Sequence, residues 1–145
     1  MPIVRNAGDL TAPVPLAARL WTDVNRWPTF VDGFSHVVEL DESWPEPGSK
    51  IVWQSGPAGR GRVTERILEH DEDHVVTEVF DEQMHARQAV FFEPGRMTME
   101  LDYELAKPGP FSKITDVLFI RRSLSMALER TIRRFSTEAA DEATL

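Results

Sequence analysis

The stretch RMTMELDYEL, residues 96–105, alternates between apolar and polar side chains along its whole length. Successive side chains of a strand point to opposite faces of a sheet. One face therefore carries only apolar or aromatic residues: Met97, Met99, Leu101, Tyr103 and Leu105. The other face carries polar or acidic residues: Thr98, Glu100, Asp102 and Glu104. This pattern predicts an antiparallel strand with one dry and one solvated face.

The same alternation of apolar and polar residues recurs in the part of the chain before residue 96. Strands are predicted in five segments: 35–41, 49–54, 62–69, 74–82 and 84–93. Turn-rich sequences such as ESWPEPG separate them, and each connection is short. Short connections join neighbouring antiparallel strands, so we expect a meander. A further strand near residues 3–11 brings the sheet to about seven strands.

Helical spacing follows the first strand. A helix of about three turns is indicated by four apolar residues: Leu16, Leu20, Trp21 and Val24. Trp27-Pro28 interrupts it, because the residue before a proline avoids the helical region. We expect a second, short helix at residues 29–33.

A long helix is expected after Pro108-Gly109-Pro110, with roughly 25 to 30 residues. Its apolar stripe consists of Phe111, Ile114, Leu118, Leu124, Leu128, Ile132 and Phe135. An amphipathic helix of this length must cover a wide apolar surface, and the dry face of the sheet is the candidate. The predicted class is α+β, with a curved antiparallel sheet wrapped around a long C-terminal helix.

The composition describes an acidic chain without cysteine. Its 145 residues are 41% hydrophobic, which suits one domain with a core. The net charge of −8 opposes nucleic-acid binding, and the lack of cysteine excludes disulfides and thiolate zinc sites. No apolar run reaches the about 18 residues of a membrane helix, and the start lacks a signal-peptide pattern. We therefore expect a cytoplasmic protein without stable membrane insertion.

Charge is unevenly distributed. From Arg121 onward there are five Arg and four acidic residues, whereas the first 120 residues hold 11 basic and 20 acidic ones. Arg late in a helix complements the negative end of the helix dipole. We interpret these Arg as docking groups that pair with the acidic rim of the sheet.

The order of these elements resembles the helix-grip fold of the START-related (SRPBCC) superfamily, and within it the polyketide cyclase/dehydrase-like proteins. The resemblance covers nearly the whole chain and is carried by APVPLAARLWTDVNRWPTF at 12–30, MELDYEL at 99–105 and LERTIRRFSTEA at 128–139. It implies one ligand-binding domain over residues 1–145, with a cavity between the sheet and the long helix. Relatives hold lipids, sterols, hormones or polyketide intermediates there, and some catalyse cyclisation and dehydration. The fold alone does not choose among these functions.

Other motifs indicate no metal or cofactor. EHDEDH at 69–74 places His70 and His74 in an acidic turn, whereas a metal site needs three or four converging ligands. GPAGRGR at 56–62 has strands on both sides, so it predicts a hairpin rather than a phosphate loop. Arg60 and Arg62 can still lie at a cavity mouth. No GxSxG nucleophile motif is present.

Acid–base chemistry has three candidates: Glu65, Arg87 and His85. Glu65 shares a face with Val63 and Ile67, so on a dry face it would be buried with a shifted pKa. The phase of strand 84–93 is ambiguous, because both of its faces carry apolar residues. Three arrangements stay open: a buried Glu65 pairs with Arg87, Gln88 hydrogen-bonds a ligand carbonyl, or Glu65 and Arg87 form an ion pair on the solvated face.

Binding of a small hydrophobic or aromatic molecule, lipid or polyketide-like, is the function that the resemblance implies first. The alternative is a polyketide cyclase/aromatase-type enzyme that uses acid–base residues in the cavity. The expected ligand contacts are Trp27, Phe30, Trp53, Met84, Gln88, Met99, Tyr103 and Leu118. Aromatic rings and methionines provide adaptable apolar walls, although core packing explains several of these residues equally well.

The run VLFI at 117–120 has more consecutive apolar residues than one buried stripe needs. Part of the long helix is therefore expected to be exposed. A second copy of the chain in a homodimer, a membrane surface, or a lid over the cavity are the partners to consider.

Overall fold

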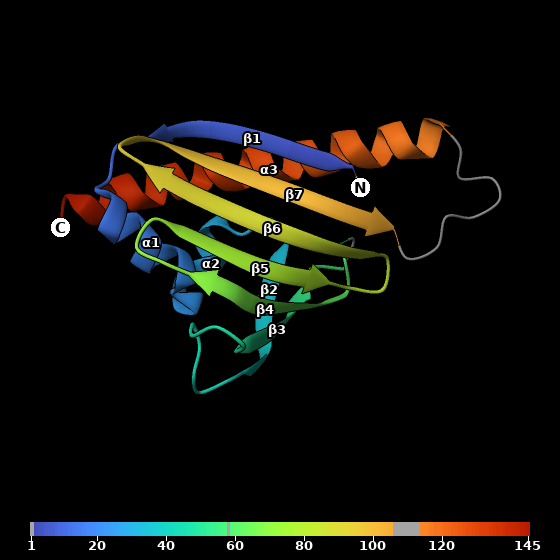
Figure 1. Cartoon of the computed structure of the whole chain (residues 1–145), viewed down its shortest axis with the longest axis horizontal. Helices are drawn as coiled ribbons and strands as arrows, with labels where there is room; N and C mark the ends of the chain where they lie inside the picture. The colour runs from blue at the N-terminus through green and yellow to red at the C-terminus, as the bar shows by residue number, and fades with distance from the viewer. Residues whose placement is uncertain (1, 58, 106–113) are drawn as a thin grey trace.

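The computed structural model describes residues 2–57, 59–105 and 114–145, the first four of the last range by their backbone only. One antiparallel sheet lies beside a long helix (Figure 1). The strands are β1 (Ile3–Leu10), β2 (Phe34–Leu40), β3 (Lys50–Ser55), β4 (Arg62–His70), β5 (His74–Phe80), β6 (Met84–Glu93) and β7 (Gly95–Leu105). The helices are α1 (Val14–Thr22), the 3-10 turn η1 (Val24–Arg26), α2 (Trp27–Phe30) and α3 (Ile114–Ala143). The predicted α+β helix-grip architecture is confirmed.

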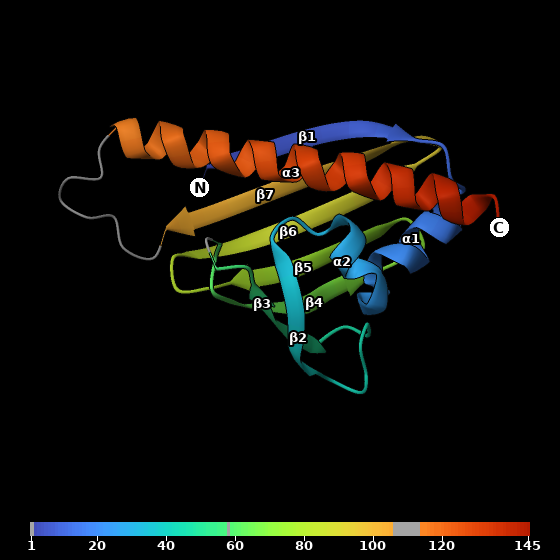
Figure 2. The same cartoon turned by 180° about the vertical axis from the view of Figure 1, so that it is seen from behind.

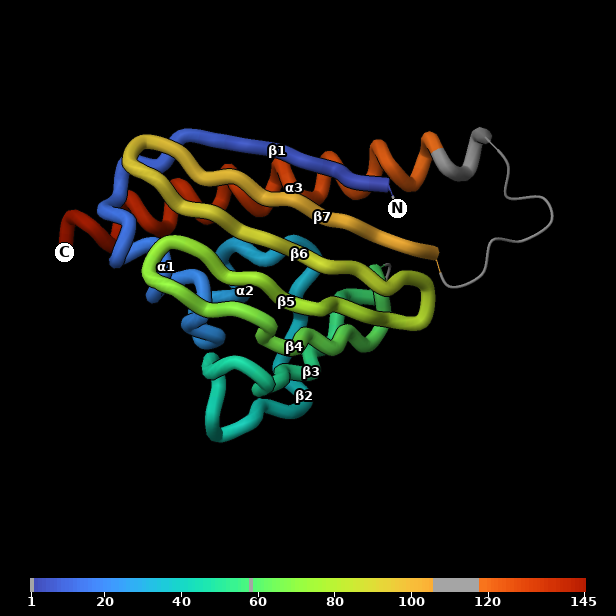
Figure 3. The backbone as a smooth tube through the Cα atoms, in the orientation of Figure 1, coloured from blue at the N-terminus to red at the C-terminus, as the bar shows by residue number. Residues whose placement is uncertain are grey.

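The sheet is the expected meander with one closing strand. Its order is β1-β7-β6-β5-β4-β3-β2, so β2 to β7 follow one another as hairpins (Figure 3). β1 returns antiparallel to β7, with Ile3 opposite Asp102 and Leu10 opposite Gly95. The first and last strands of the chain therefore lie together.

Pairing between strands resolves the phase that the sequence left open. In β6 the inward face carries Met84, Ala86, Gln88, Val90 and Phe92. Gln88 lies opposite Thr77 of β5 and Leu101 of β7. Glu65 of β4 lies opposite Ile51 and Val79, and it is buried. The dry face therefore contains a carboxyl and an amide among apolar side chains.

The helices after β1 begin earlier than predicted. α2 starts at Trp27 and holds Pro28 in its first turn, where a proline costs no hydrogen bond, so the expected range 29–33 was wrong. The Trp27 indole donates a 2.8 Å hydrogen bond to the carbonyl of Trp21. This bond fixes α2 against α1.

α3 lies beside β1 (Figure 2). Gly8 permits the approach, because a Cβ there would lie 2.5 Å from Cγ2 of Ile132. The Asn6 amide donates to the carbonyl of Ser125 (2.7 Å), and the Ser136 hydroxyl donates to the carbonyl of Asp9 (2.6 Å). The close approach at Gly8 and the two hydrogen bonds beside it therefore position α3 on β1.

The apolar stripe of α3 is buried only in its second half. Leu128, Ile132 and Phe135 are buried as predicted, and Leu124 is partly buried. Leu118 is 60% exposed, which corrects its expected place in the buried stripe. The expected punctuation at 108–110, residue 111, and the side chains of residues 114 and 117 lie outside the described residues.

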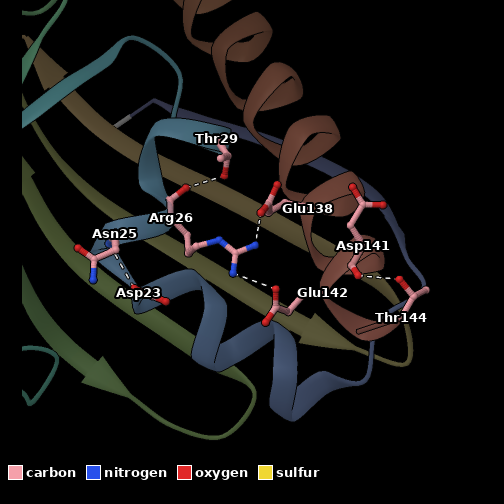
Figure 4. A network of polar contacts seen from close by, with 8 residues as sticks. All are labelled: Asp23, Asn25, Arg26, Thr29, Glu138, Asp141, Glu142 and Thr144. Carbon is pink, nitrogen blue, oxygen red and sulfur yellow. Dashed lines mark hydrogen bonds and ion pairs between the residues drawn. The ribbon is translucent and has the colours of Figure 1, made fainter.

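At the C-terminal end of α3 the charges are reversed from the prediction: the helix carries the acidic residues, and the arginine comes from another element. Arg26 of η1 pairs with Glu138 and, at 2.9 Å, with Glu142 (Figure 4). Of the helix arginines, Arg130 and Arg134 both pair with Asp32, in the loop after α2. Docking through charge is thus observed, but the residues that pair with α3 lie in η1 and in the loop after α2 rather than on the sheet rim.

Among the described residues, no helix has the length and apolar character needed to cross a membrane.

Candidate ligand cavity

A cavity of about 100 Å³ lies between the sheet, the α2 segment and α3. The sheet, the β3–β4 hairpin, the segment from α1 to the loop after α2, and α3 each contribute residues to its lining. Its lining residues are Trp21, Trp27, Val31, Asp32, Trp53, Arg60, Glu65, Gln88, Met99, Leu101, Leu124, Ala127, Leu128 and Thr131. Most are apolar or aromatic, with a few polar groups among them, which is the usual composition of a small-molecule site.

Glu65 is the buried acid of this cavity. Its Oε2 accepts a 2.8 Å hydrogen bond from the indole Nε1 of Trp53. Burial raises the pKa of the Glu65 carboxyl, while the Trp53 bond, the Arg60 charge and the Thr77 hydroxyl oppose that rise more weakly. The neutral form of Glu65 therefore persists to a higher pH than that of an ordinary carboxyl, and in this form the group can both donate and accept a hydrogen bond.

Arg60 brings a cation to the same cavity from the β3–β4 hairpin. Its Nε donates a 2.8 Å bond to Oδ2 of Asp81, whose side chain is only 2% exposed. Asp81 is itself fixed, because its Oδ1 accepts from the backbone N–H groups of Gln83 and Met84. The Nη2 of Arg60 is buried and has no hydrogen-bond partner among the described residues. The Arg60 guanidinium is thus fixed through its Nε, and the N–H groups of its Nη2 are available to donate to a ligand.

The sheet supplies neutral polar groups at the cavity. Gln88 contributes an amide to the lining, and beside it Thr77, which does not line the cavity, has a buried hydroxyl without a well-aligned partner in the described chain. A buried donor or acceptor without a partner costs about 1–3 kcal/mol. Of the residues that line the cavity, Arg60 carries such a donor, its Nη2, so a ligand with a hydrogen-bond acceptor would be stabilised there.

Asp32 and Thr131 join the wall formed by α3 to the loop after α2. The Asp32 carboxylate accepts from Nε (2.9 Å) and Nη2 (3.1 Å) of Arg130, and its backbone N–H meets the Thr131 hydroxyl at 3.2 Å. The Arg130 bonds are the main reason that the pKa of Asp32 lies below its ordinary value. These contacts hold the two sides of the cavity together.

The structure distributes the eight predicted ligand residues unevenly. Four of them line the cavity: Trp27, Trp53, Gln88 and Met99. Three are buried in the core without lining it: Phe30, Met84 and Tyr103. Phe30 packs instead on Trp21 and Phe135, at ring-centroid distances of 5.4 and 4.9 Å. Leu118 is exposed on α3 and does not line the cavity.

Of the three acid–base candidates, only Glu65 lies in the cavity. Arg87 and His85 are exposed on the outer face of the sheet, where His85 Nε2 lies 3.4 Å from Glu78. Both arrangements considered for Glu65 and Arg87 are therefore wrong, because the two residues point to opposite faces. The charged neighbour of Glu65 is Arg60.

The sequence interpretation missed Trp21, Asp32 and Asp81 and left Arg60 only as a residue of the cavity mouth. Asp81 directly follows β5, at the start of the turn to β6, and accepts two backbone bonds there, as an aspartate that starts a turn does. That turn pattern was visible, but its pairing with Arg60 was not. Arg62 is exposed.

The acidic turn at 69–74 holds a histidine rather than a cluster of metal ligands. His74 lies within 2.9–3.4 Å of three carboxylates: Asp73, Glu69 and Asp71. Its hydrogen bond with Asp73 is the main cause that raises the pKa of its imidazole. In the described part of the chain, no group of three or more metal-binding side chains has the geometry to hold an ion.

Comparison with known proteins identifies the fold and no family. No family profile and no curated protein match the chain. Protein TTHA0849 from Thermus thermophilus has a TM-score of 0.76 at 17% identity, over 98% of this chain and 99% of that one. The di-domain ARO/CYC StfQ from the steffimycin biosynthetic pathway has a TM-score of 0.79 at 15% identity, over 99% of this chain and 52% of that one.

A plant enzyme shares the same architecture. Norcoclaurine synthase from Thalictrum flavum, in complex with dopamine and hydroxybenzaldehyde, has a TM-score of 0.70 at 11% identity, over 97% of this chain and 87% of that one. The chain has the helix-grip fold. The fold that the sequence resemblance predicted is thereby confirmed.

Proposed function

We propose that this protein binds a small apolar or aromatic molecule that carries an oxygen-bearing group. The observation that carries the proposal is the buried, unpartnered Nη2 of Arg60 in a cavity otherwise walled by indole rings and aliphatic side chains. The apolar body of the ligand would contact Trp27, Trp53 and Met99. Its oxygen would accept from Arg60 and exchange a hydrogen bond with Glu65.

The size of the cavity limits the ligand. An engineered apolar cavity of about 150 Å³ holds benzene. A volume of about 100 Å³ therefore suits at most one small ring in the described conformation. A lipid or polyketide-sized ligand requires α3 to move away from the loop at Asp32, so the Asp32–Arg130 contact would control its entry.

Three one-ring probes test this proposal: toluene, phenol and benzoate. Fluorescence of the cavity tryptophans should report binding, and phenol or benzoate should bind about tenfold or more tightly than toluene because hydrogen bonds to charged groups are strong. Arg60→Met should remove this preference while leaving toluene binding intact. Arg62→Met, an exposed change in the same hairpin, is the matched control.

Native mass spectrometry of the purified protein supplies a second test, since a tightly held ligand would add its mass to the chain. Absence of binding by all three probes, together with no retained small molecule, would reject the binding proposal. Equal affinities for toluene and phenol would reject the assigned role of Arg60.

Cyclase-type catalysis is the second candidate, favoured by the buried Glu65 and by Arg60 in one cavity. Two of the structural neighbours are an ARO/CYC and norcoclaurine synthase, as their names state. Cyclisation of a polyketide begins with enolisation, in which a base removes a proton alpha to a carbonyl. Glu65 in its ionised form is the base available, and Arg60 would stabilise the enolate oxygen.

Deuterium exchange at the central carbon of acetylacetone, followed by NMR in heavy water, tests this candidate. The wild-type protein should accelerate exchange over buffer, and Glu65→Gln should abolish the acceleration. Glu39→Gln, an exposed change on β2, is the control. Exchange at the buffer rate in the wild type, with probe binding intact, would leave a binding protein and reject the enzyme.

A further inference from the structure

The first half of α3 carries an exposed patch that is both apolar and basic. Leu118, Phe119 and Met126 are 60%, 71% and 47% exposed, and Arg121 and Arg122 between them are exposed too. We call these five residues the α3 patch. We propose that the α3 patch docks this protein on an anionic lipid surface.

Three residues of the patch lie on the side of α3 opposite its buried stripe, whereas Leu118 and Arg121 lie nearer the side of that stripe and are exposed in this N-terminal part of the helix. Phe119, Arg122 and Met126 recur at spacings of three and four residues, so they share one side of the helix. Leu128 and Phe135, which are buried, lie on the opposite side. In both cartoon views, the N-terminal turns of α3 extend past the start of β1 (Figures 1 and 2).

The charge of this region is opposite to that of the whole protein. Residues 118–135 contain five Arg and one acid, Glu129, in a chain with a net charge of −8. Asp32 compensates part of this charge through Arg130 and Arg134, and a net positive charge remains. Anionic headgroups attract such a segment, while exposed Phe and Leu side chains partition into the boundary between headgroups and acyl chains.

Two other occupants fit the patch less well. A two-fold dimer places the same surface on both subunits, so the arginines of the α3 patch would face their own copies. Nucleic acid attracts arginines, but it gains little from the exposed apolar side chains of Leu118 and Phe119. A lipid surface uses both the apolar and the basic residues.

The patch is continuous along α3 with the cavity wall. Leu124, Ala127 and Leu128 line the cavity within three turns of Phe119. A lipid surface contacting the patch would therefore lie beside the part of α3 that lines the cavity. The docking proposal itself does not depend on the cavity having a ligand.

Cosedimentation of the full chain with lipid vesicles tests the proposal. The protein should bind vesicles of equal parts phosphatidylserine and phosphatidylcholine, should not bind pure phosphatidylcholine, and should be released by high salt. The double variant Leu118→Gln with Phe119→Gln should lower the partition coefficient about tenfold or more. Arg121→Gln with Arg122→Gln should lower it by a similar factor and remove most of the salt dependence.

Matched controls come from the outer face of the sheet. Phe91→Gln replaces an aromatic residue that is 40% exposed, and Arg66→Gln with Arg87→Gln removes two exposed charges. These variants should bind as the wild type does, and circular dichroism and thermal unfolding would show that every variant is folded. Equal binding by the patch variants and the wild type, or no binding to phosphatidylserine vesicles at low salt, would overturn the proposal. A wild-type dimer in light scattering that the apolar variants convert to monomer, without vesicle binding, would assign the patch to a second copy instead.

Discussion

The indole Nε1 of Trp53 donates a 2.8 Å hydrogen bond to Oε2 of Glu65, on the dry face of the sheet. A carboxyl in such a place costs free energy unless it is neutral or well bonded. One indole bond and a nearby guanidinium do not offset the burial, so the pKa of Glu65 stays raised. The buried carboxyl therefore lowers the stability of the core, and it places an acid in the lining of the cavity.

Glu65→Gln should change how stability depends on pH. Because the pKa of Glu65 is higher in the folded state, the folded protein binds this proton more tightly, and the wild type loses stability as pH rises from the unfolded to the folded pKa. Between those values the loss is about 1.4 kcal/mol per pH unit, and Gln removes it. In urea unfolding from pH 4 to pH 8, the free energy of unfolding of Glu65→Gln should rise relative to that of the wild type. The control Glu39→Gln should show no such trend. A constant difference between variant and wild type would contradict the raised pKa.

Asp32→Asn should have the opposite pH dependence. The pKa of Asp32 is lowered, chiefly by its hydrogen bonds from Arg130, so its contribution is fully present above the unfolded value of about 4 and is lost as pH falls through the folded value. We expect a loss of about 1 kcal/mol at neutral pH, because the pair is partly solvated, and almost none at low pH. Urea unfolding at the two pH values measures this, with Asp9→Asn, exposed on β1, as the control. The same loss at both pH values would mean that the charge of Asp32 is not responsible.

The strands could be predicted from the sequence because their signal is local. In β7 every apolar residue from Met97 to Tyr103 is buried, as the alternation requires. The inward face of β6 could not be assigned with the same certainty as that of β7, because Ala89 and Phe91 place apolar residues on its outer face too, and Gln88 interrupts the inner one. The register of Gln88 with Thr77 and Leu101 decides it, and register is a property of three strands together.

The site was harder to predict than the fold because its key contacts join distant segments. Arg60 and Arg62 are two residues apart in the same hairpin, yet only Arg60 reaches the cavity. Its direction depends on Asp81, in another turn. For α3 the periodicity of the sequence does not reveal where the surface beneath the helix ends, so Leu118 was predicted to be buried.

Gly8→Ala should destabilise the protein by about 1–3 kcal/mol, the usual cost of overpacking. The new methyl would lie 2.5 Å from Cγ2 of Ile132, where β1 meets α3. Combining it with Ile132→Ala should cost less than the sum of the two single changes, because the truncation makes room for the methyl. Gly56→Ala, with no atom within 4 Å of the new Cβ, is the control for the loss of a glycine. Chemical denaturation gives the free energy of unfolding of the wild type and of each variant. Strict additivity of the two single losses in the double variant would mean that residues 8 and 132 do not touch.

Arg26→Gln should loosen the C-terminal end of α3 and leave the cavity wall in place. The change removes the ion pairs to Glu138 and Glu142 (Figure 4), which are partly exposed, so the global loss should be only about 0.5–1 kcal/mol. Hydrogen exchange should be faster for the backbone amides of residues 138–143 and unchanged for residues 124–132, because the latter are held by Asp32 and by packing on β1. Arg133→Gln, exposed on the same helix, should alter neither region. Faster exchange along the whole of α3 would show instead that the helix opens as one unit and that Arg26 holds all of it.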